Sequence, residues 1–146
     1  MPVRVDTYIV EDFIQTITTT SRRDVARRIA RALVDLRLAA CVQIVGPIES
    51  IYRWQGRIET AREWLCLIKT TRARFREVAA AIEALHPYDT PEIVALPITV
   101  GSQRYLEWLA ASVRRESPSD ESRVSNARTI GNRKSAIGNA RRSGCP

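Results

Sequence analysis

The feature that most restricts the fold of this chain is a pair of long segments, rich in apolar and β-branched residues, with only two residues between them. The first segment, residues 40–54, has the sequence ACVQIVGPIESIYRW, and the second, residues 57–71, has the sequence RIETAREWLCLIKTT. Gln55 and Gly56 separate them. Two-residue hairpin loops need positive φ angles, which glycine adopts without strain. The sequence therefore predicts a β-hairpin with two very long strands.

The register of this hairpin follows from the position of the turn. An unbulged register pairs Trp54 with Arg57 and places Glu49 opposite Arg62, so that opposite charges meet across the strands. Pro47 has no backbone N–H to donate to a neighbouring strand. We therefore expect the first strand to bend, to bulge or to lie at an edge of the sheet near this proline.

The length of the hairpin also predicts self-association. Each strand could run for about 14 residues, against a usual 5 or 6, so roughly half of its length must project beyond helices of ordinary size. The projecting part carries the large apolar residues Ile48, Ile51, Tyr52, Trp54 and Ile58. An apolar ribbon with open edges would aggregate unless it paired with another chain. We therefore expect a homo-oligomer that is built by the hairpins.

The segment before the hairpin predicts a strand followed by a helix. Apart from Gln15, residues 13–20, FIQTITTT, are β-branched or aromatic. Ser21 and Asp24 fit a capping box at the start of the helix, and apolar residues follow at helical spacing: Val25, Ile29, Leu33 and Leu36. The other face of this helix carries four arginines, which indicate either a phosphate-binding surface or an ordinary solvated face: Arg23, Arg27, Arg28 and Arg31.

The segment after the hairpin predicts a helix, a strand and a further helix. The first helix follows Thr71 and is ended by Pro87, and one of its faces is apolar. Residues 92–98, EIVALPI, predict a buried strand, and residues 101–115 predict a helix with Ser102 as its cap. The resulting order, β-α-β-β-α-β plus a C-terminal helix, predicts an α+β fold, the ferredoxin-like sandwich.

The overall composition is that of an ordinary globular domain. The chain has 146 residues, of which 45% are hydrophobic, and no window approaches the roughly 18 uninterrupted apolar residues that would span a bilayer. No secretory signal can be recognised at the start of the chain, and three cysteines without CxxC spacing indicate reduced thiols, so we expect a cytoplasmic protein. We expect no membrane association.

The net charge of +7 is concentrated towards the C-terminus. Residues 117–146 carry six of the 23 Lys and Arg residues but only two of the 16 Asp and Glu residues. This segment is rich in Ser, Asn, Gly and Arg and has only isolated apolar residues, so it predicts a disordered basic tail. Only this tail would support binding to a nucleic acid, and we expect none from the rest of the chain.

Four separate motifs in this order resemble the CutA divalent-cation-tolerance family. They are RLAACVQIVGPIESIYRWQGRIE around the hairpin turn, IKTT at 68–71, LHPYDTPEIVALPI at 85–98 and YLEWL at 105–109. The resemblance implies a ferredoxin-like protomer related in fold to the PII signalling proteins, and a homotrimer assembled through the long hairpins. It also implies a cytoplasmic protein that is linked to copper and other divalent metals. The domain would span residues 13–116, after an N-terminal extension of residues 1–12.

The resemblance also nominates metal ligands, although this chain departs from the family at two positions. Cys41 would supply a soft thiolate and His86 a borderline nitrogen, for a divalent metal, copper first, that is held weakly or transiently. Cys41 could instead be a small buried hydrophobic residue, as free cysteines often are. Some relatives have a cysteine where this chain has Thr18 and a second histidine where it has Leu85, which removes two candidate copper ligands.

A second group of residues is predicted to line a cleft between subunits. The resemblance places there Lys69, Tyr88, Glu92 and Trp54. These side chains could bind a metal or a small anion, or form a hydrogen-bonded lock across a trimer interface. The alternative function is therefore a PII-like sensor, which binds a small anionic metabolite in the cleft and signals to an unidentified protein partner. Tyr52, Trp54 and Trp108 are predicted at the oligomer interface, and Trp64 in the core or the interface.

An enzymatic function finds little support in the sequence. No GxSxG, Walker loop, GxGxxG or HExxH motif is present, and His86 is the sole histidine. No nucleophile lies beside it in the sequence. We therefore expect that the protein is not an enzyme.

Overall fold

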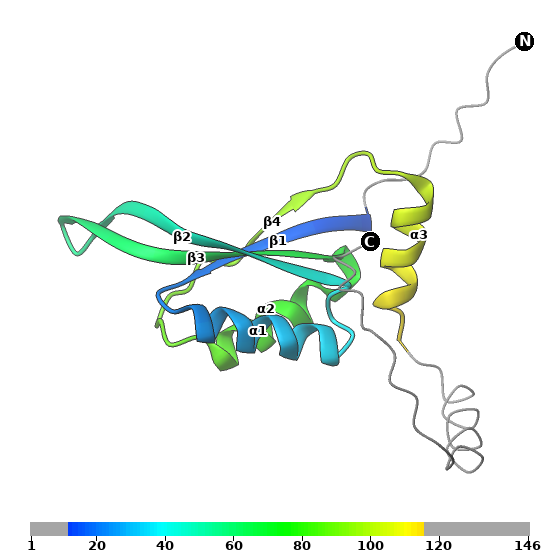
Figure 1. The fold of residues 1–146 in the computed structure, drawn as a ribbon, viewed down its shortest axis with the longest axis horizontal. Coiled ribbons are helices and arrows are strands. Elements are labelled where there is room, and N and C mark those ends of the chain that lie inside the picture. Colours follow the sequence, from blue (N-terminus) through cyan, green and yellow to red (C-terminus); the bar gives the residue numbers. More distant parts are fainter. Residues whose placement is uncertain (1–11, 116–146) are drawn as a thin grey trace, which may run out of the picture. The chain divides into compact units, whose positions relative to one another are not determined.

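The computed structural model describes residues 12–115 (Figure 1). A four-stranded antiparallel sheet has the strand order β2-β3-β1-β4. Its strands are β1 (Phe13–Thr20), β2 (Cys41–Trp54), β3 (Arg57–Thr71) and β4 (Val94–Pro97). The helices are α1 (Arg23–Asp35), α2 (Phe75–Leu85) and α3 (Gln103–Ser112), with a short 3₁₀ turn, η2 (Arg72–Arg74), before α2. The predicted α+β ferredoxin-like fold with a C-terminal helix is confirmed, whereas the predicted disordered tail lies outside the described residues.

The long hairpin forms with the predicted register. Trp54 pairs with Arg57 and Glu49 with Arg62. Gln55 and Gly56 form the turn, both with positive φ, at 47° and 77°. The pairing of β2 with β3 shifts between Val45 and Ile48, so the expected bulge occurs at Gly46-Pro47. Pro47 also lies on an edge strand, where a residue without a backbone N–H is tolerated.

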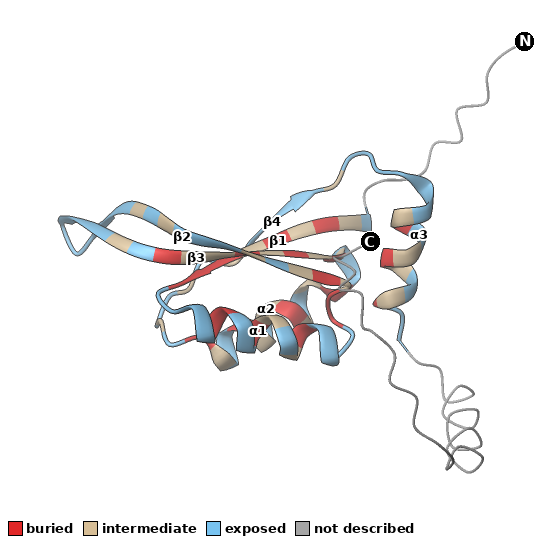
Figure 2. Ribbon diagram, viewed as in Figure 1, coloured by how far each residue is buried: buried red, intermediate tan, exposed pale blue. Residues whose placement is uncertain are grey.

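The core of the domain lies between the two helices α1 and α2 and one face of the sheet (Figure 2). The helices contribute buried residues at helical spacing, and β3 contributes Cys66 and Ile68, which point to the same face because side chains alternate along a strand. The core cluster consists of Val25, Ala26, Ile29, Leu33, Leu38, Ala39, Cys66, Ile68, Val78 and Ile82. The apolar stripes that the sequence indicated on both helices are therefore the surfaces that pack.

The opposite face of the sheet is only partly covered. Residues on this face include Ile17, Leu65 and Leu67, which are half-buried, and Val94 and Leu96, which are 45% and 54% exposed. The prediction that residues 92–98 form a buried strand is therefore wrong for a single chain. The strand is only four residues long, it lies at the edge of the sheet, and α1 and α2 cover the other face.

The start of α1 also differs from the prediction. The helix begins at Arg23, its N-cap is Arg22, and no side chain makes a capping hydrogen bond there, so the predicted capping box at Ser21 is wrong. Instead, the Arg22 backbone N–H donates to Oγ1 of Thr20 at 3.2 Å. The Arg22 side chain forms an ion pair with Asp24 at 2.7 Å, so the carboxylate that would have completed the box is engaged elsewhere.

Helix α3 is fixed against the rest of the domain at its C-terminal end. Leu106, Leu109 and Val113 are buried. The buried Arg74, which precedes α2, donates from Nε to the backbone carbonyl of Val113 at 2.8 Å. Ser102 is the N-cap as predicted, but its hydroxyl makes no capping hydrogen bond. Between residues 12 and 115, no helix is long and apolar enough to cross a membrane.

Candidate functional site

The single histidine lies at the junction between α2 and the end of β1. His86 is the C-cap residue of α2, and its side chain is 9% exposed. Its Nε2 lies 2.8 Å from the backbone carbonyl of Thr19, and its Nδ1 accepts a hydrogen bond from the backbone N–H of Tyr88 at 3.1 Å. A carbonyl can only accept and an amide N–H can only donate, so these bonds fit the neutral ring with its proton on Nε2. Both ring nitrogens are therefore occupied.

Tyr88 connects this histidine to a buried carboxylate. Its hydroxyl donates to Oε2 of Glu63 at 2.9 Å, and its ring centroid lies 4.7 Å from that of His86. Burial, followed by the interactions with Glu63, raises the pKa of Tyr88 above its ordinary value, against a lowering by a hydrogen bond with Ser21. The phenol thus remains protonated and acts as a donor. Glu63 is only 6% exposed and lies in β3, far from Tyr88 in the sequence, so no local sequence pattern identified it.

Glu92 also contacts Thr19, through the side chain of that residue, whereas His86 contacts its backbone carbonyl. Its Oε2 accepts a long hydrogen bond of 3.5 Å from Oγ1 of Thr19. The structure therefore brings together His86, Tyr88 and Glu92, as the sequence suggested, and adds Glu63. In one chain these groups bond to one another or to the end of β1. Two carboxylates and one neutral imidazole favour a cation over an anion electrostatically, but within residues 12–115 they do not form a group that could hold a metal ion.

The other two residues of the predicted cleft lie elsewhere in the chain. Lys69 is near the opposite end of β1, where it faces Gln15 and donates from Nζ to Oε1 of Gln43. Trp54 ends β2 at the tip of the hairpin, and its side chain is 50% exposed. A single chain therefore does not assemble the predicted cleft. Its completion would require a second copy of the chain.

The residues predicted at the oligomer interface differ in exposure. Tyr52 is 44% exposed near the hairpin tip, beside Trp54. Trp108 is half-buried in α3, and its ring lies 5.4 Å from that of Tyr105. The two residues of the hairpin are therefore available to another chain, whereas Trp108 already has an aromatic neighbour.

The two predicted metal ligands are not close to each other, and Cys41 is disulfide-bonded, so the expectation that it is a reduced thiol is wrong. Cys41 begins β2 opposite Lys69, whereas His86 contacts Thr19, which lies opposite Leu65. Four residues of β3 separate these positions, or about 13 Å at the usual rise of a strand, whereas metal–ligand bonds are about 2 Å long. Within residues 12–115, no three His, Cys, Asp or Glu side chains form a group that could hold a metal ion. One chain alone therefore does not fit a metal site built from both.

Thr18, where some relatives have a cysteine, directly precedes Thr19, whose carbonyl lies 2.8 Å from Nε2 of His86. It pairs with Cys66 of β3 and is fully buried on the face that α1 and α2 cover. Burial raises the pKa of the Cys66 thiol to about 11, as expected for a structural thiol in an apolar core. Cys66 is thus a buried residue of the core.

The fold is therefore that of an α+β ferredoxin-like domain with an unusually long central hairpin. The family described as CutA1 divalent ion tolerance protein matches residues 14–112. The chain is 53% identical to the divalent-cation tolerance protein CutA of Thermus thermophilus over 93 residues. This alignment covers 64% of this chain and 90% of that protein. The chain belongs to the CutA1 divalent ion tolerance family.

Solved structures and a longer relative agree with this assignment. The Thermus thermophilus protein superposes with a TM-score of 0.69 at 48% identity, covering 70% of this chain and 99% of that one. A protein from Archaeoglobus fulgidus, described as a periplasmic divalent cation tolerance protein CutA, gives a TM-score of 0.68 at 38% identity, covering 70% and 99%. The chloroplastic CutA of Arabidopsis thaliana is 43% identical over 101 residues, which make up 69% of this chain but only 56% of that protein.

Proposed function

We propose that this protein contributes to the tolerance of divalent cations, copper first, and that it works as a homotrimer. The observation that carries the proposal is the family match over residues 14–112, which includes nearly all of the folded domain. Relatives with this fold are named for divalent-cation tolerance. The closest test is growth of cells that lack the gene, in medium with raised copper, zinc or cobalt. Growth equal to that of the parent strain at every metal concentration would contradict the proposal.

The trimer is supported by the surfaces that a single chain leaves open. The tip of the hairpin exposes Ile51 at 67% and Ile58 at 68%, and β2 and β4 are edge strands with open hydrogen-bonding groups. The partly covered sheet face adds further apolar area. Such surfaces in an isolated protein favour association, and the family resemblance implies three copies. Light scattering that gives a monomer mass at micromolar concentration would contradict this part of the proposal.

Any metal site that uses the predicted ligands would be assembled from more than one chain. His86 has both nitrogens in hydrogen bonds, and Cys41 lies about 13 Å away along the sheet at the usual strand rise. A metal that bound His86 would have to displace the Thr19 carbonyl or the Tyr88 amide. We therefore expect copper to bind weakly, with a stoichiometry that follows the oligomer, and this expectation is separate from the tolerance phenotype.

Copper titration of purified protein tests this expectation. Copper(I) and copper(II) would be added to a chain that ends at Glu116, so that Cys145 cannot contribute, alongside the variants Cys41→Ser and His86→Ala. Because Cys41 is disulfide-bonded, the protein would first be reduced, and we then expect each variant to lower copper affinity. The full chain would be titrated in parallel as the reference. If both variants bind copper like the parent, Cys41 and His86 are structural residues and the metal is held elsewhere.

A second function, the sensing of a small anionic metabolite, is favoured by one observation. The chain has a pocket with two arginines, described below, although it lies apart from the predicted cleft. The hairpin tip would then carry the signal to a protein partner. We also propose that the protein is not an enzyme, since its only imidazole has both nitrogens engaged in structural hydrogen bonds. A cytoplasmic location stays a prediction, and fractionation of cells would test it against the periplasmic location of the Archaeoglobus fulgidus relative.

A further inference from the structure

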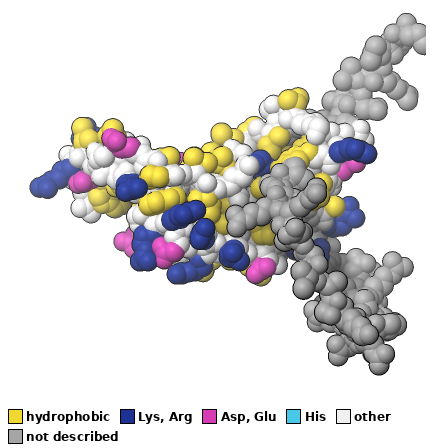
Figure 3. Space-filling view, viewed as in Figure 1, with side chains coloured by type: hydrophobic (Ala, Val, Ile, Leu, Met, Phe, Trp, Pro, Cys, Tyr) yellow, Lys and Arg dark blue, Asp and Glu magenta, His cyan; other side chains and the backbone are white. Residues whose placement is uncertain are grey.

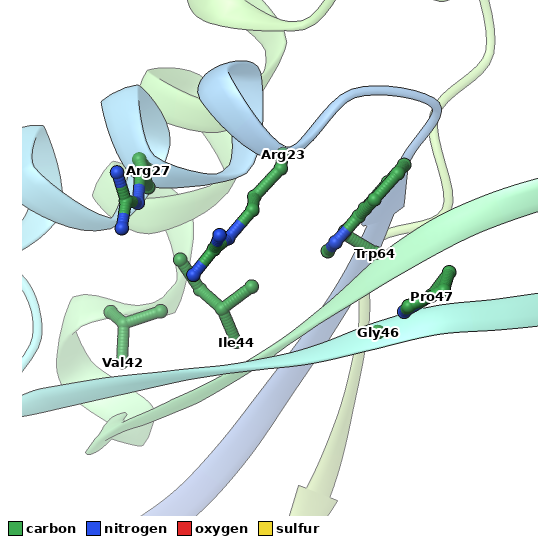
Figure 4. A pocket seen from close by; sticks show the side chains of 7 residues that line it. All are labelled: Arg23, Arg27, Val42, Ile44, Gly46, Pro47 and Trp64. Carbon is green, nitrogen blue, oxygen red and sulfur yellow. The ribbon is translucent and has the colours of Figure 1, made fainter.

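A pocket lies between the N-terminal half of α1 and the edge strand β2, where the sheet extends beyond the cover of the helices. It has a volume of about 490 Å³, within the usual range for small-molecule sites. Its walls come from three elements: Arg23 and Arg27 of α1, Val42 and Ile44 of β2, and Trp64 of β3. Figure 4 shows both arginine side chains extending from α1 towards β2, with Trp64 across the pocket above Gly46.

The pocket is positively charged and contains no acidic side chain. The side chains of Arg23 and Arg27 make no hydrogen bond or ion pair with another residue between 12 and 115, and the neighbouring Asp24 is engaged by Arg22. Lys and Arg side chains also gather over the region of α1 on the surface (Figure 3). Arg23 and Arg27 are one helical turn apart on α1 and line the same pocket, which would allow both guanidinium groups to bind one anion. Paired guanidinium groups match the oxygen atoms of phosphate and carboxylate groups.

Trp64 gives the pocket a flat apolar wall. The indole is half-buried against the core and lies so close to Gly46 that a Cβ at that position would be 2.5 Å from Cδ1. The guanidinium of Arg62 also lies 5.7 Å from the centroid of the Trp64 ring. Val42 and Ile44 add an apolar floor. An indole face of this kind favours the stacking of a planar ring.

This pocket is distinct from the cluster around Thr19. Side chains alternate along a strand, so Trp64 points to the face that the helices cover, whereas its neighbour Glu63 points to the other face, where Tyr88 binds it. We propose that the pocket binds a small phosphorylated molecule that carries a flat ring, with the phosphate between Arg23 and Arg27 and the ring against Trp64. This proposal does not depend on the role in cation tolerance.

Calorimetric titration of the full chain at low ionic strength tests the proposal with three probes. Adenosine monophosphate has both groups, inorganic phosphate has only the charge, and adenosine has only the ring. We expect adenosine monophosphate to bind about tenfold more tightly than phosphate, a difference that corresponds to about 1.4 kcal/mol. Adenosine should bind more weakly than adenosine monophosphate. Equal affinities for phosphate and adenosine monophosphate would overturn the role of Trp64, and no binding of the monophosphate at about 1 mM would overturn the site.

A charge-matched pair of variants separates this site from general attraction to a basic surface. Arg23→Gln with Arg27→Gln should weaken the binding of adenosine monophosphate by about tenfold or more, since charged hydrogen bonds are lost. Arg28→Gln with Arg31→Gln removes the same charge from the same helix outside the pocket lining, and should change affinity less than about twofold. An equal loss of affinity in both pairs of variants would show that adenosine monophosphate binds to the net charge of the helix, and would overturn the site. Thermal melts confirm that each variant is folded.

Discussion

Three buried threonines of the sheet allow a test of how hydrogen bonding, apart from shape, stabilises this domain. Thr16, Thr18 and Thr70 are all fully buried on the face that α1 and α2 cover. The Thr70 hydroxyl donates to the backbone carbonyl of Leu38 at 2.6 Å. Among residues 12–115, the hydroxyl oxygens of Thr16 and Thr18 have no hydrogen-bond partner. Replacement by valine keeps the shape of the side chain, so the effect reports on the hydroxyl group.

The expected effects have opposite signs. A buried hydroxyl without a partner costs about 1–3 kcal/mol, so Thr18→Val should raise the free energy of unfolding by about 1 kcal/mol or more. Thr16→Val should do the same. Thr70→Val loses a net hydrogen bond of about 1 kcal/mol and also leaves the Leu38 carbonyl without its donor, so the free energy of unfolding should fall by about 2 kcal/mol. The Thr18 and Thr70 variants should thus differ by about 3 kcal/mol.

Guanidinium unfolding of all four proteins at one fixed protein concentration measures these differences. The concentration must be fixed because association contributes to the apparent stability of an oligomer. The denaturant concentration at the midpoint should be highest for Thr18→Val, lower for the parent and lowest for Thr70→Val. The dependence of the unfolding free energy on denaturant should be equal in all of them. A Thr18→Val variant that is less stable than the parent by 1 kcal/mol or more would refute the reasoning, because it would mean that this hydroxyl is satisfied in the folded protein.

Three further predictions concern packing, pH and assembly. Gly46→Ala should lower stability by about 1–3 kcal/mol, because its Cβ would lie 2.5 Å from the Trp64 ring, whereas Gly101→Ala meets only Leu106 atoms at 3.1 Å and should cost less; equal midpoints would contradict this. The raised pKa of Cys66, about 11 against 9.0, means that the folded chain holds this proton more tightly. Stability should therefore fall by about 2 kcal/mol as pH rises from 9 to 11, and melts of Cys66→Ala should show a smaller fall. Trp54→Ala should weaken assembly more than it weakens the fold of one chain, and an oligomer mass that is unchanged on dilution would count against an interface at the hairpin tip.

The elements of the fold were predictable because their signals are local. The alternation of residues 13–20, the turn at Gln55-Gly56 and the stop at Pro87 each act over a few positions, and each is found where it was expected. Even the bulge near Pro47 follows from the missing N–H of a single residue. Right-handed crossovers then leave few ways to join these elements, so the ferredoxin-like order could be predicted as well.

Burial at the edges of the sheet was decided only by the tertiary structure. Residues 92–98 are as apolar as a core strand, yet β4 is exposed because it lies at an edge and no element of the described chain covers that side. The apolar sequence thus favours burial of this strand but does not identify the surface that would cover it. The capping box at Ser21 failed for a related reason, since the Asp24 carboxylate that it would have used is paired with the Arg22 side chain.

The sequence alone determined the strands, the helices, the hairpin register and the family, because each depends on short-range patterns or on motifs in a fixed order. Only the tertiary structure decided which distant residues meet. It joined His86 to Thr19 and Tyr88 to Glu63, and it set Arg23 and Arg27 beside Trp64. Such contacts depend on how helices and strands pack in space, where a shift of one residue turns a side chain to the other face of the sheet. No local pattern carries that information.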